Sequence, residues 1–288
     1  MNFQPQIITD SYRVRGPLVQ YGTELLNDVF AEGRNTEANR IPFSPPSEHR
    51  HPPAFPEIPR SEFYRTLAER VADPSKINQS GSSLCGPASL LYITALRHPS
   101  RYAGFLTRLY EYGDASLGAL RIKPGHDCRH YDPSGKMAGA DWVGLAGIRD
   151  SENVLFDYDE VEDMFAGITL PMTLTRWLGQ AGFSNVRNEA NVLFTKGEAN
   201  LREADALFRI GKNVCLLVHG DGVETINDSM TFLPNHWVVL SSGINFNGPN
   251  LSFTLYTWGE GTYQVPHTAG VYPIRAFLKN YYGFVCAD

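Results

Sequence analysis

One stretch of the chain, residues 90–96 (LLYITAL), is apolar on nearly every side of the helix that it predicts. The residues before it, 78–84, are rich in Gly and Ser, a composition that predicts a loop. Pro87 suits the first turn of a helix, where its missing N–H group would have no intrahelical partner. The pattern therefore predicts a buried helix that begins near Cys85 and is entered from a polar loop.

Apolar residues recur at helical spacing in several other segments. These segments are residues 18–30, 61–72, 102–112, 169–182 and 200–210. Strand-like patterns follow after residue 190. They cover residues 214–218, 237–240 and 251–257, with a shorter candidate at 261–265 and a hairpin turn at 247–250 that joins the second strand to the third. Helices first and an antiparallel sheet afterwards predict an α+β domain.

The first 60 residues predict an arm rather than part of the domain. Prolines crowd the end of this arm, at Pro42, Pro45, Pro46, Pro52, Pro53, Pro56 and Pro59. No helix or central strand tolerates that density, so residues 42–60 predict an extended strap on the surface. His49 and His51 in the strap are interpreted as solvated side chains rather than metal ligands. We expect residues 61–288 to form the folded domain, with a core between about 75 and 265.

Composition narrows the class of protein. The 288 residues are 42% hydrophobic, and the net charge of −6 argues against a nucleic-acid-binding surface. No apolar run is long enough to predict a membrane span, and residues 1–6 lack the pattern of a signal peptide. The four cysteines are widely spaced and form no CxxC pair, which favours a reduced compartment during synthesis. We therefore expect a protein made in the cytoplasm without a cleavable signal.

Cys85 is the candidate nucleophile. The unpaired N–H groups and the positive dipole end at the start of a helix stabilise a thiolate, which predicts a lowered thiol pKa. Gln79, six residues earlier, offers a side-chain amide that can donate to an oxyanion. A nucleophile with such a donor beside it is what acyl transfer requires. The alternative interpretation is that Cys85 is a buried, small apolar side chain.

Cysteine catalysis also needs a base. Among the eight histidines, His236 stands at the start of an apolar strand, between Asn235 and Trp237. A titratable side chain is unusual at such a position, which makes His236 the candidate base. The alternative interpretation is a histidine that is simply hydrogen-bonded at a strand end. His219, at the end of the neighbouring predicted strand, is the competing candidate and is typical of a turn residue.

The segment 126–130 (HDCRH) resembles a metal site at first sight. Its His and Cys side chains lie two residues apart, and no second ligand pair with zinc spacing occurs elsewhere, whereas structural zinc uses four well-spaced donors. A structural zinc protein centred on Cys128 stays an alternative, but we expect neither a metal nor a cofactor.

The order of Gln79, Cys85-Gly86 at a helix start and His236 at a strand entrance resembles the papain-like cysteine peptidase superfamily. The likeness covers about residues 75–265 and is greatest to the bacterial bacteriocin-processing (C39-type) domains and to secreted toxin or effector domains. The separation of Cys85 and His236 is near that between nucleophile and base in papain-type enzymes. The resemblance implies a papain-like fold, with Cys85 as nucleophile, His236 as base and Gln79 in the oxyanion hole.

The sequence departs from the family at the third catalytic position. Members usually carry an Asp or Asn on the strand after the histidine, whereas Thr257 stands at the matching place here. A threonine hydroxyl can accept from the imidazole but stabilises an imidazolium less than a carboxylate does. Trp258 is interpreted either as a cover for the site or as an ordinary packed side chain.

These features together predict a thiol hydrolase that acts on amide bonds, as a peptidase or as an amidase or deamidase. The alternatives are a transglutaminase-like acyltransferase and a catalytically inactive papain-like binding module. The family resemblance and the proline-rich arm suit a bacterial toxin or effector that a specialised secretion system exports into a target cell. The expected partners are a protein, peptide or peptidoglycan substrate, with an immunity protein or secretion machinery, and no nucleic acid.

Overall fold

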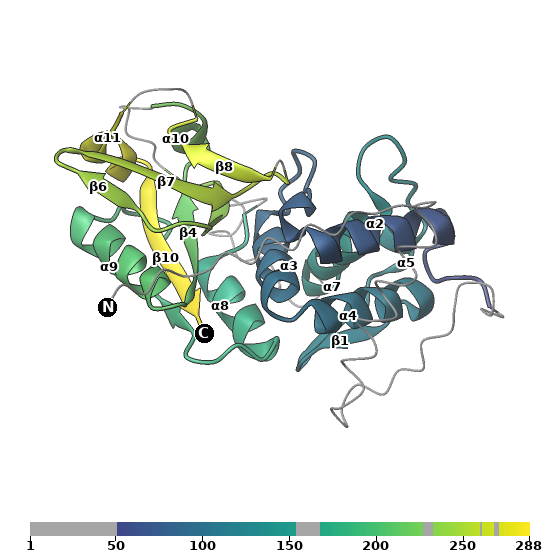
Figure 1. Ribbon diagram of the computed structural model, residues 1–288. Coiled ribbons are helices and arrows are strands. Elements are labelled where there is room, and N and C mark those ends of the chain that lie inside the picture. Colours follow the sequence, from purple (N-terminus) through teal and green to yellow (C-terminus); the bar gives the residue numbers. More distant parts are fainter. Residues whose placement is uncertain (1–50, 154–167, 227–232, 260, 268–270) are drawn as a thin grey trace, which may run out of the picture.

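The computed structural model describes residues 51–153, 168–226, 233–259, 261–267 and 271–288. The helix predicted at 18–30, His49 and residues 42–50 of the proline-rich strap lie outside the described residues. The expectation of a surface strap is wrong for the part that is described, because Phe55 and Ile58 are buried in the core of the helical half. Within them the chain has a helical half followed by a half built on an antiparallel sheet, so the predicted α+β class is confirmed (Figure 1).

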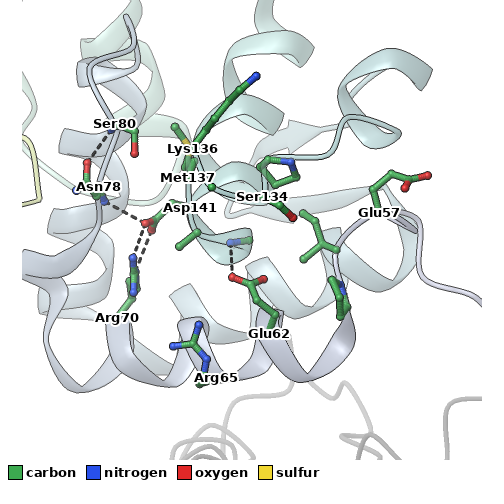
Figure 2. A pocket seen from close by; sticks show the side chains of 16 residues that line it. Glu57, Glu62, Arg65, Arg70, Asn78, Ser80, Ser134, Lys136, Met137 and Asp141 are labelled. Carbon is green, nitrogen blue, oxygen red and sulfur yellow. Dashed lines mark hydrogen bonds and ion pairs between the residues drawn. The ribbon is translucent and has the colours of Figure 1, made fainter.

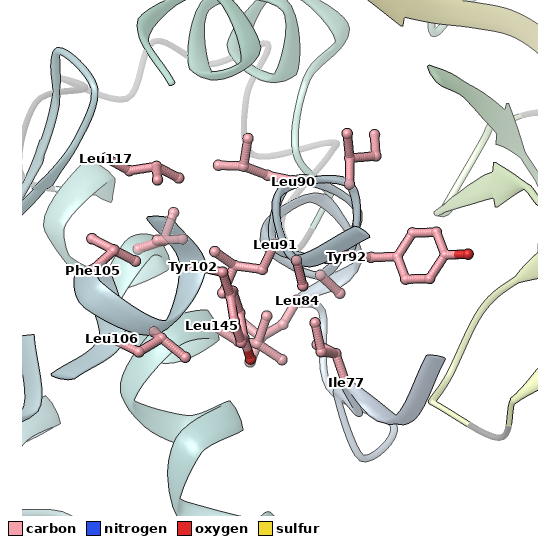
Figure 3. Packing of buried hydrophobic residues seen from close by; sticks show 14 of the residues in the cluster. Ile77, Leu84, Leu90, Leu91, Tyr92, Tyr102, Phe105, Leu106, Leu117 and Leu145 are labelled. Carbon is pink, nitrogen blue, oxygen red and sulfur yellow. The ribbon is translucent and has the colours of Figure 1, made fainter. Parts of the chain in front are cut away.

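The helical half is organised around the predicted apolar helix, which is α3 (Cys85–Arg97). Every residue of α3 from Cys85 to Ala95 is buried. Figure 3 shows Leu91 facing Tyr102 and Leu106 of the neighbouring helix, while Tyr92 points the other way, toward the strands. The other elements of this half are α2 (Arg60–Ala72), η4 (Pro74–Lys76), α4 (Pro99–Tyr112), β1 (Ala115–Leu117), β2 (Leu120–Ile122), α5 (His126–Arg129), α6 (Gly139–Asp141), the π-helical turn η5 (Trp142–Ala146) and α7 (Gly147–Asn153).

The main sheet has the strand order β3-β10-β4-β5-β7-β6, with β8 and β9 also paired to β7, and all pairs are antiparallel. Its strands are β3 (Arg187–Asn188), β4 (Asn213–Val218), β5 (His236–Leu240), β6 (Asn245–Asn247), β7 (Asn250–Tyr256), β8 (Thr262–Val265), β9 (Tyr272–Pro273) and β10 (Tyr281–Ala287). The remaining helices are α8 (Pro171–Gln180), α9 (Glu198–Arg209), α10 (Asp221–Glu224) and α11 (Ile274–Leu278).

The central strands β4, β5 and β10 are buried on both faces of the sheet, which explains why they are continuously apolar. Alternate residues of β4 and β5, such as Cys215 and Trp237, pack into the core shared with α3. Their neighbours, such as Val214 and Val238, pack into a second core with α9 and α11. The sheet therefore separates two cores, and α3 lies directly against β5 on one face.

Two sequence expectations about the sheet need correction. Residues 245–247 form a strand of their own, so the turn after them joins β6 to β7 rather than β5 to β7. The sequence of β6, Asn-Phe-Asn, is too short and too polar to predict a strand. The sheet also continues beyond residue 265, because β10 lies between β3 and β4. Within the described residues no helix is both long and apolar enough to span a membrane.

Candidate active site

Cys85 is the first residue of α3 and is 3% exposed. No side chain of the described residues caps this helix end, so its first N–H groups remain available at the thiol. Burial raises the pKa of the Cys85 thiol, and hydrogen bonds from the backbone N–H groups of Trp237, Gly86 and Cys85 only partly oppose it. The expected lowering of this pKa is therefore wrong: desolvation outweighs the helix end, and the resting group is a thiol.

His236 begins β5 and is 6% exposed. Its Nε2 lies 2.5 Å from Oγ1 of Thr257, the residue that follows β7. The indole of Trp258 stacks on the imidazole, with ring centroids 4.8 Å apart and planes 5° from parallel. Burial lowers the pKa of His236 to about 4. The imidazole is therefore neutral at neutral pH and is oriented by two consecutive residues, Thr257 and Trp258.

The nucleophile helix and the histidine strand meet at Trp237. Its backbone N–H reaches the Cys85 thiol, and this N–H belongs to the residue bonded directly to His236. Its indole N–H donates to the carbonyl of Thr169 at 2.7 Å. A Cβ on Gly86 would lie 2.1 Å from Thr169 Oγ1, so only glycine fits beside the nucleophile. Thr169, which the sequence did not single out, thus packs between the two elements that carry Cys85 and His236.

Gln79 lies in the loop before α3 and is 3% exposed. The loop turns sharply at Ser80 and Gly81, whose φ values of 50° and 71° are left-handed. The Ser82 N–H and hydroxyl both donate to the Gln79 carbonyl, at 3.0 and 2.5 Å. The side-chain Oε1 of Gln79 is buried without a hydrogen-bond partner among the described residues. A buried amide with an unused polar atom is suited to a ligand that brings its own polar groups.

Of the competing candidates, His219 lies beside Asn235, the residue before His236, whereas segment 126–130 lies in the helical half. His219 follows β4, with Nε2 3.4 Å from the Asn235 side-chain nitrogen and Nδ1 3.7 Å from an Asp221 carboxylate oxygen. In segment 126–130 the imidazoles of His126 and His130 stack in solvent while the Cys128 side chain is buried. No group of three potential metal-ligating side chains occurs among the residues that the structure describes.

The other three cysteines are buried, reduced thiols. Burial raises the pKa of Cys128 to about 12 and also raises the pKa values of Cys215 and Cys286. Among the described residues, three backbone N–H groups act against burial at Cys85, whereas none does so at these three thiols. This difference, rather than burial, distinguishes Cys85.

The comparisons with known proteins returned no relative: no family model, no curated protein and no solved structure matches this chain.

Proposed function

We propose that the protein is a papain-like cysteine hydrolase that cleaves amide bonds, with Cys85 as nucleophile, His236 as base and Gln79 as oxyanion donor. One observation carries the proposal. The Cys85 thiol, at a helix start, is reached by the backbone N–H of Trp237, and the adjacent His236 has its Nε2 engaged by Thr257.

The hydrogen bond to Thr257 is compatible with the useful form of the imidazole, because a threonine hydroxyl can accept from Nε2–H as well as donate to a bare Nε2. When the Nε2–H of His236 donates to Thr257 Oγ1, the lone pair is on Nδ1, which can take the thiol proton. The thiolate then attacks the carbonyl carbon of the substrate. The Cys85 N–H and the Gln79 side-chain amide donate to the resulting oxyanion. The amide C–N bond breaks as His236 returns the proton to the leaving amine, and water hydrolyses the thioester.

The resting pair is neutral, because burial raises the pKa of Cys85 and lowers that of His236. Proton transfer from thiol to imidazole therefore accompanies attack rather than precedes it. Thr257 fits this mechanism, since a hydroxyl orients a neutral imidazole without having to stabilise a resting imidazolium.

The same neutral pair favours a second candidate, a papain-like binding module without catalysis. A module of this kind needs the fold and a recognition surface but no activated thiolate. The acyltransferase alternative uses the same first half of the mechanism and differs only in an amine, instead of water, attacking the thioester.

Acylation by p-nitrophenyl acetate separates the two candidates, because it forms a thioester without a matched substrate. We expect intact-mass and peptide-mass analysis to find one acetyl group, on Cys85. His236→Ala should slow its formation about 100-fold. Cys128→Ala is the control, since it removes another buried thiol outside the site. Equal acetylation of Cys85 and Cys128, or no effect of His236→Ala, would favour the binding module.

We also propose a toxin or effector role, supported by the proline-rich arm and by the resemblance of residues 75–265 to such domains. Expression of the full chain in a bacterial cytoplasm or periplasm should impair growth, and Cys85→Ala should restore it. Equal growth of both strains in both compartments would contradict this role.

A further inference from the structure

The loop that carries Gln79 is attached to the helical half by a buried ion pair. The Asp141 carboxylate, at the end of α6, is fully buried and accepts the Asn78 N–H at 3.2 Å. Arg70 of α2 donates to both Asp141 oxygens, at 3.2 Å from Nε and 2.7 Å from Nη2. Figure 2 shows Asp141 lying between Arg70 and Asn78, so that one carboxylate joins α2 to the residue next to Gln79.

The same loop is held from the opposite side by the sheet half. The Tyr256 hydroxyl, at the end of β7, donates to the Ile77 carbonyl at 2.7 Å. Gly259 approaches so closely that a Cβ there would lie 2.4 Å from the Asn78 Cβ. Residues 77 and 78 are therefore fixed between the two halves, immediately before the candidate oxyanion donor.

The geometry around Asp141 favours a positioning role over a merely stabilising one. A buried Arg–Asp pair contributes little net stability, since desolvation offsets most of the attraction. The two hydrogen bonds from Arg70 instead fix the position of the Asp141 carboxylate, and this carboxylate in turn fixes the Asn78 backbone. A hollow of about 460 Å³ opens beside this pair, bounded by Asn78 and Ser80 on either side of Gln79 in the sequence.

We propose that Asp141 and Arg70 are positioning residues that hold the Gln79 amide at the oxyanion of the reaction. The proposal rests on the function proposed above, in which Gln79 donates to that oxyanion. Neither Asp141 nor Arg70 contacts the substrate in this role. Its effect passes through the Asn78 N–H to the next residue of the loop.

Two reactions of Cys85 separate this role from a general effect on the fold. Acylation by p-nitrophenyl acetate passes through an oxyanion, whereas alkylation by iodoacetamide does not. The ratio of the two rates therefore reports the oxyanion donors and cancels changes in thiol access or basicity. The test variant combines Arg70→Met with Asp141→Leu, because removal of both charges leaves neither buried alone. Asp141→Asn, which keeps the shape of the side chain, is the second variant.

We expect the double variant to lower the acylation-to-alkylation ratio about 10-fold or more, and Gln79→Ala to lower it about 100-fold. In a Gln79→Ala background the double variant should add nothing further, because it acts through Gln79. Glu62→Gln is the matched control: it lies on α2 in the same hollow and accepts a backbone N–H, that of Gly139, at 2.9 Å. This control should leave the ratio within about twofold of the wild-type value.

The outcomes distinguish the two proposals. If Gln79→Ala leaves the ratio unchanged, the oxyanion role of Gln79 fails, and the positioning role with it. If Gln79→Ala lowers the ratio but neither Asp141 variant does, only the positioning role is overturned.

Hydrogen exchange of the wild-type protein tests the same attachment without any substitution. We expect the Asn78 amide to exchange as slowly as amides inside α2, since it donates to a fully buried carboxylate. Rapid exchange at Asn78 would overturn the proposal even if no variant folded.

Discussion

The two halves of the molecule bury polar groups in different ways. Among the residues that the structure describes, the helical half encloses four charged side chains in its interior, Arg70, Glu111, Asp141 and Glu152. In the described part of the sheet half, one charged residue, Asp205, and the titratable His236 are buried, while β4, β5 and β10 are buried along their whole lengths. One half therefore relies on specific charge pairs, and the other on apolar packing and the backbone ladder.

The difference matters because each half supplies one part of the candidate site. Asn78, the residue before Gln79, is held by the Asp141–Arg70 pair, whereas His236 is placed by the pairing of β5 with β4 and β7. A ladder tolerates changes of side chain because its hydrogen bonds are made by the backbone. A buried pair does not, because loss of one partner leaves a charge uncompensated. The oxyanion side should thus be more sensitive to substitution than the histidine side.

The largest expected effect is that of Arg70→Met alone. It leaves the Asp141 carboxylate buried without its partner and should lower the free energy of unfolding by about 3–5 kcal/mol. Urea denaturation of this variant and of the Arg70→Met/Asp141→Leu double variant measures the difference. The double variant should be the more stable of the two, because it buries no unpaired charge. If Arg70→Met is as stable as the wild type, the helical half does not rely on its buried charge pairs, and the contrast with the sheet half is lost.

The sequence predicted those parts of the site that depend on local pattern. The apolar run after Cys85 indicated a buried helix, and the apolar strand after His236 indicated a sheet position; both elements occur as expected. These predictions succeed because the periodicity of a helix or strand is written in adjacent residues.

The sequence could not predict what depends on long-range packing. Arg70 and Asp141 are 71 residues apart, and no pattern of spacing joins them. The direction of the Cys85 pKa also depends on packing, since the helix end favours a thiolate and only the packed core shows that burial outweighs it. The sequence did not predict β10, because Gly283 interrupts its run of apolar residues near the end of the chain. The strand that it pairs with, β4, was predicted.

The two halves should have opposite effects on how stability changes with pH. The pKa of His236 is lowered to about 4, so the stability it contributes is present above about 6.5 and is lost as pH falls through 4. Burial raises the pKa of Asp141 to about 6 despite Arg70, so its contribution is present below about 3.8 and is lost as pH rises through 6. Between about pH 4 and 6 the two slopes have opposite signs.

Each contribution amounts to roughly 3 kcal/mol across its window. Unfolding by urea at several pH values between 4 and 7 should therefore show a shallow profile for the wild type. His236→Phe should leave a profile in which stability falls with rising pH, and Arg70→Met/Asp141→Leu one in which it rises. If both variants keep the wild-type dependence of stability on pH, then the pKa values of His236 and Asp141 are not shifted by burial as expected.

The smallest expected effect tests the hydroxyl that orients His236. Thr257→Val keeps the volume of the side chain but removes the partner 2.5 Å from Nε2, at a cost of about 1 kcal/mol in stability. Without that partner the imidazole can carry its proton on Nδ1, and a protonated Nδ1 cannot accept the thiol proton. Acylation of Cys85 should therefore slow about 10-fold. Thr257→Ser keeps the hydroxyl and should retain most of the wild-type rate. Equal rates for the Val and Ser variants would mean that stacking on Trp258, at 4.8 Å, is sufficient to hold the ring, and that the sheet half needs no specific polar contact to place its base.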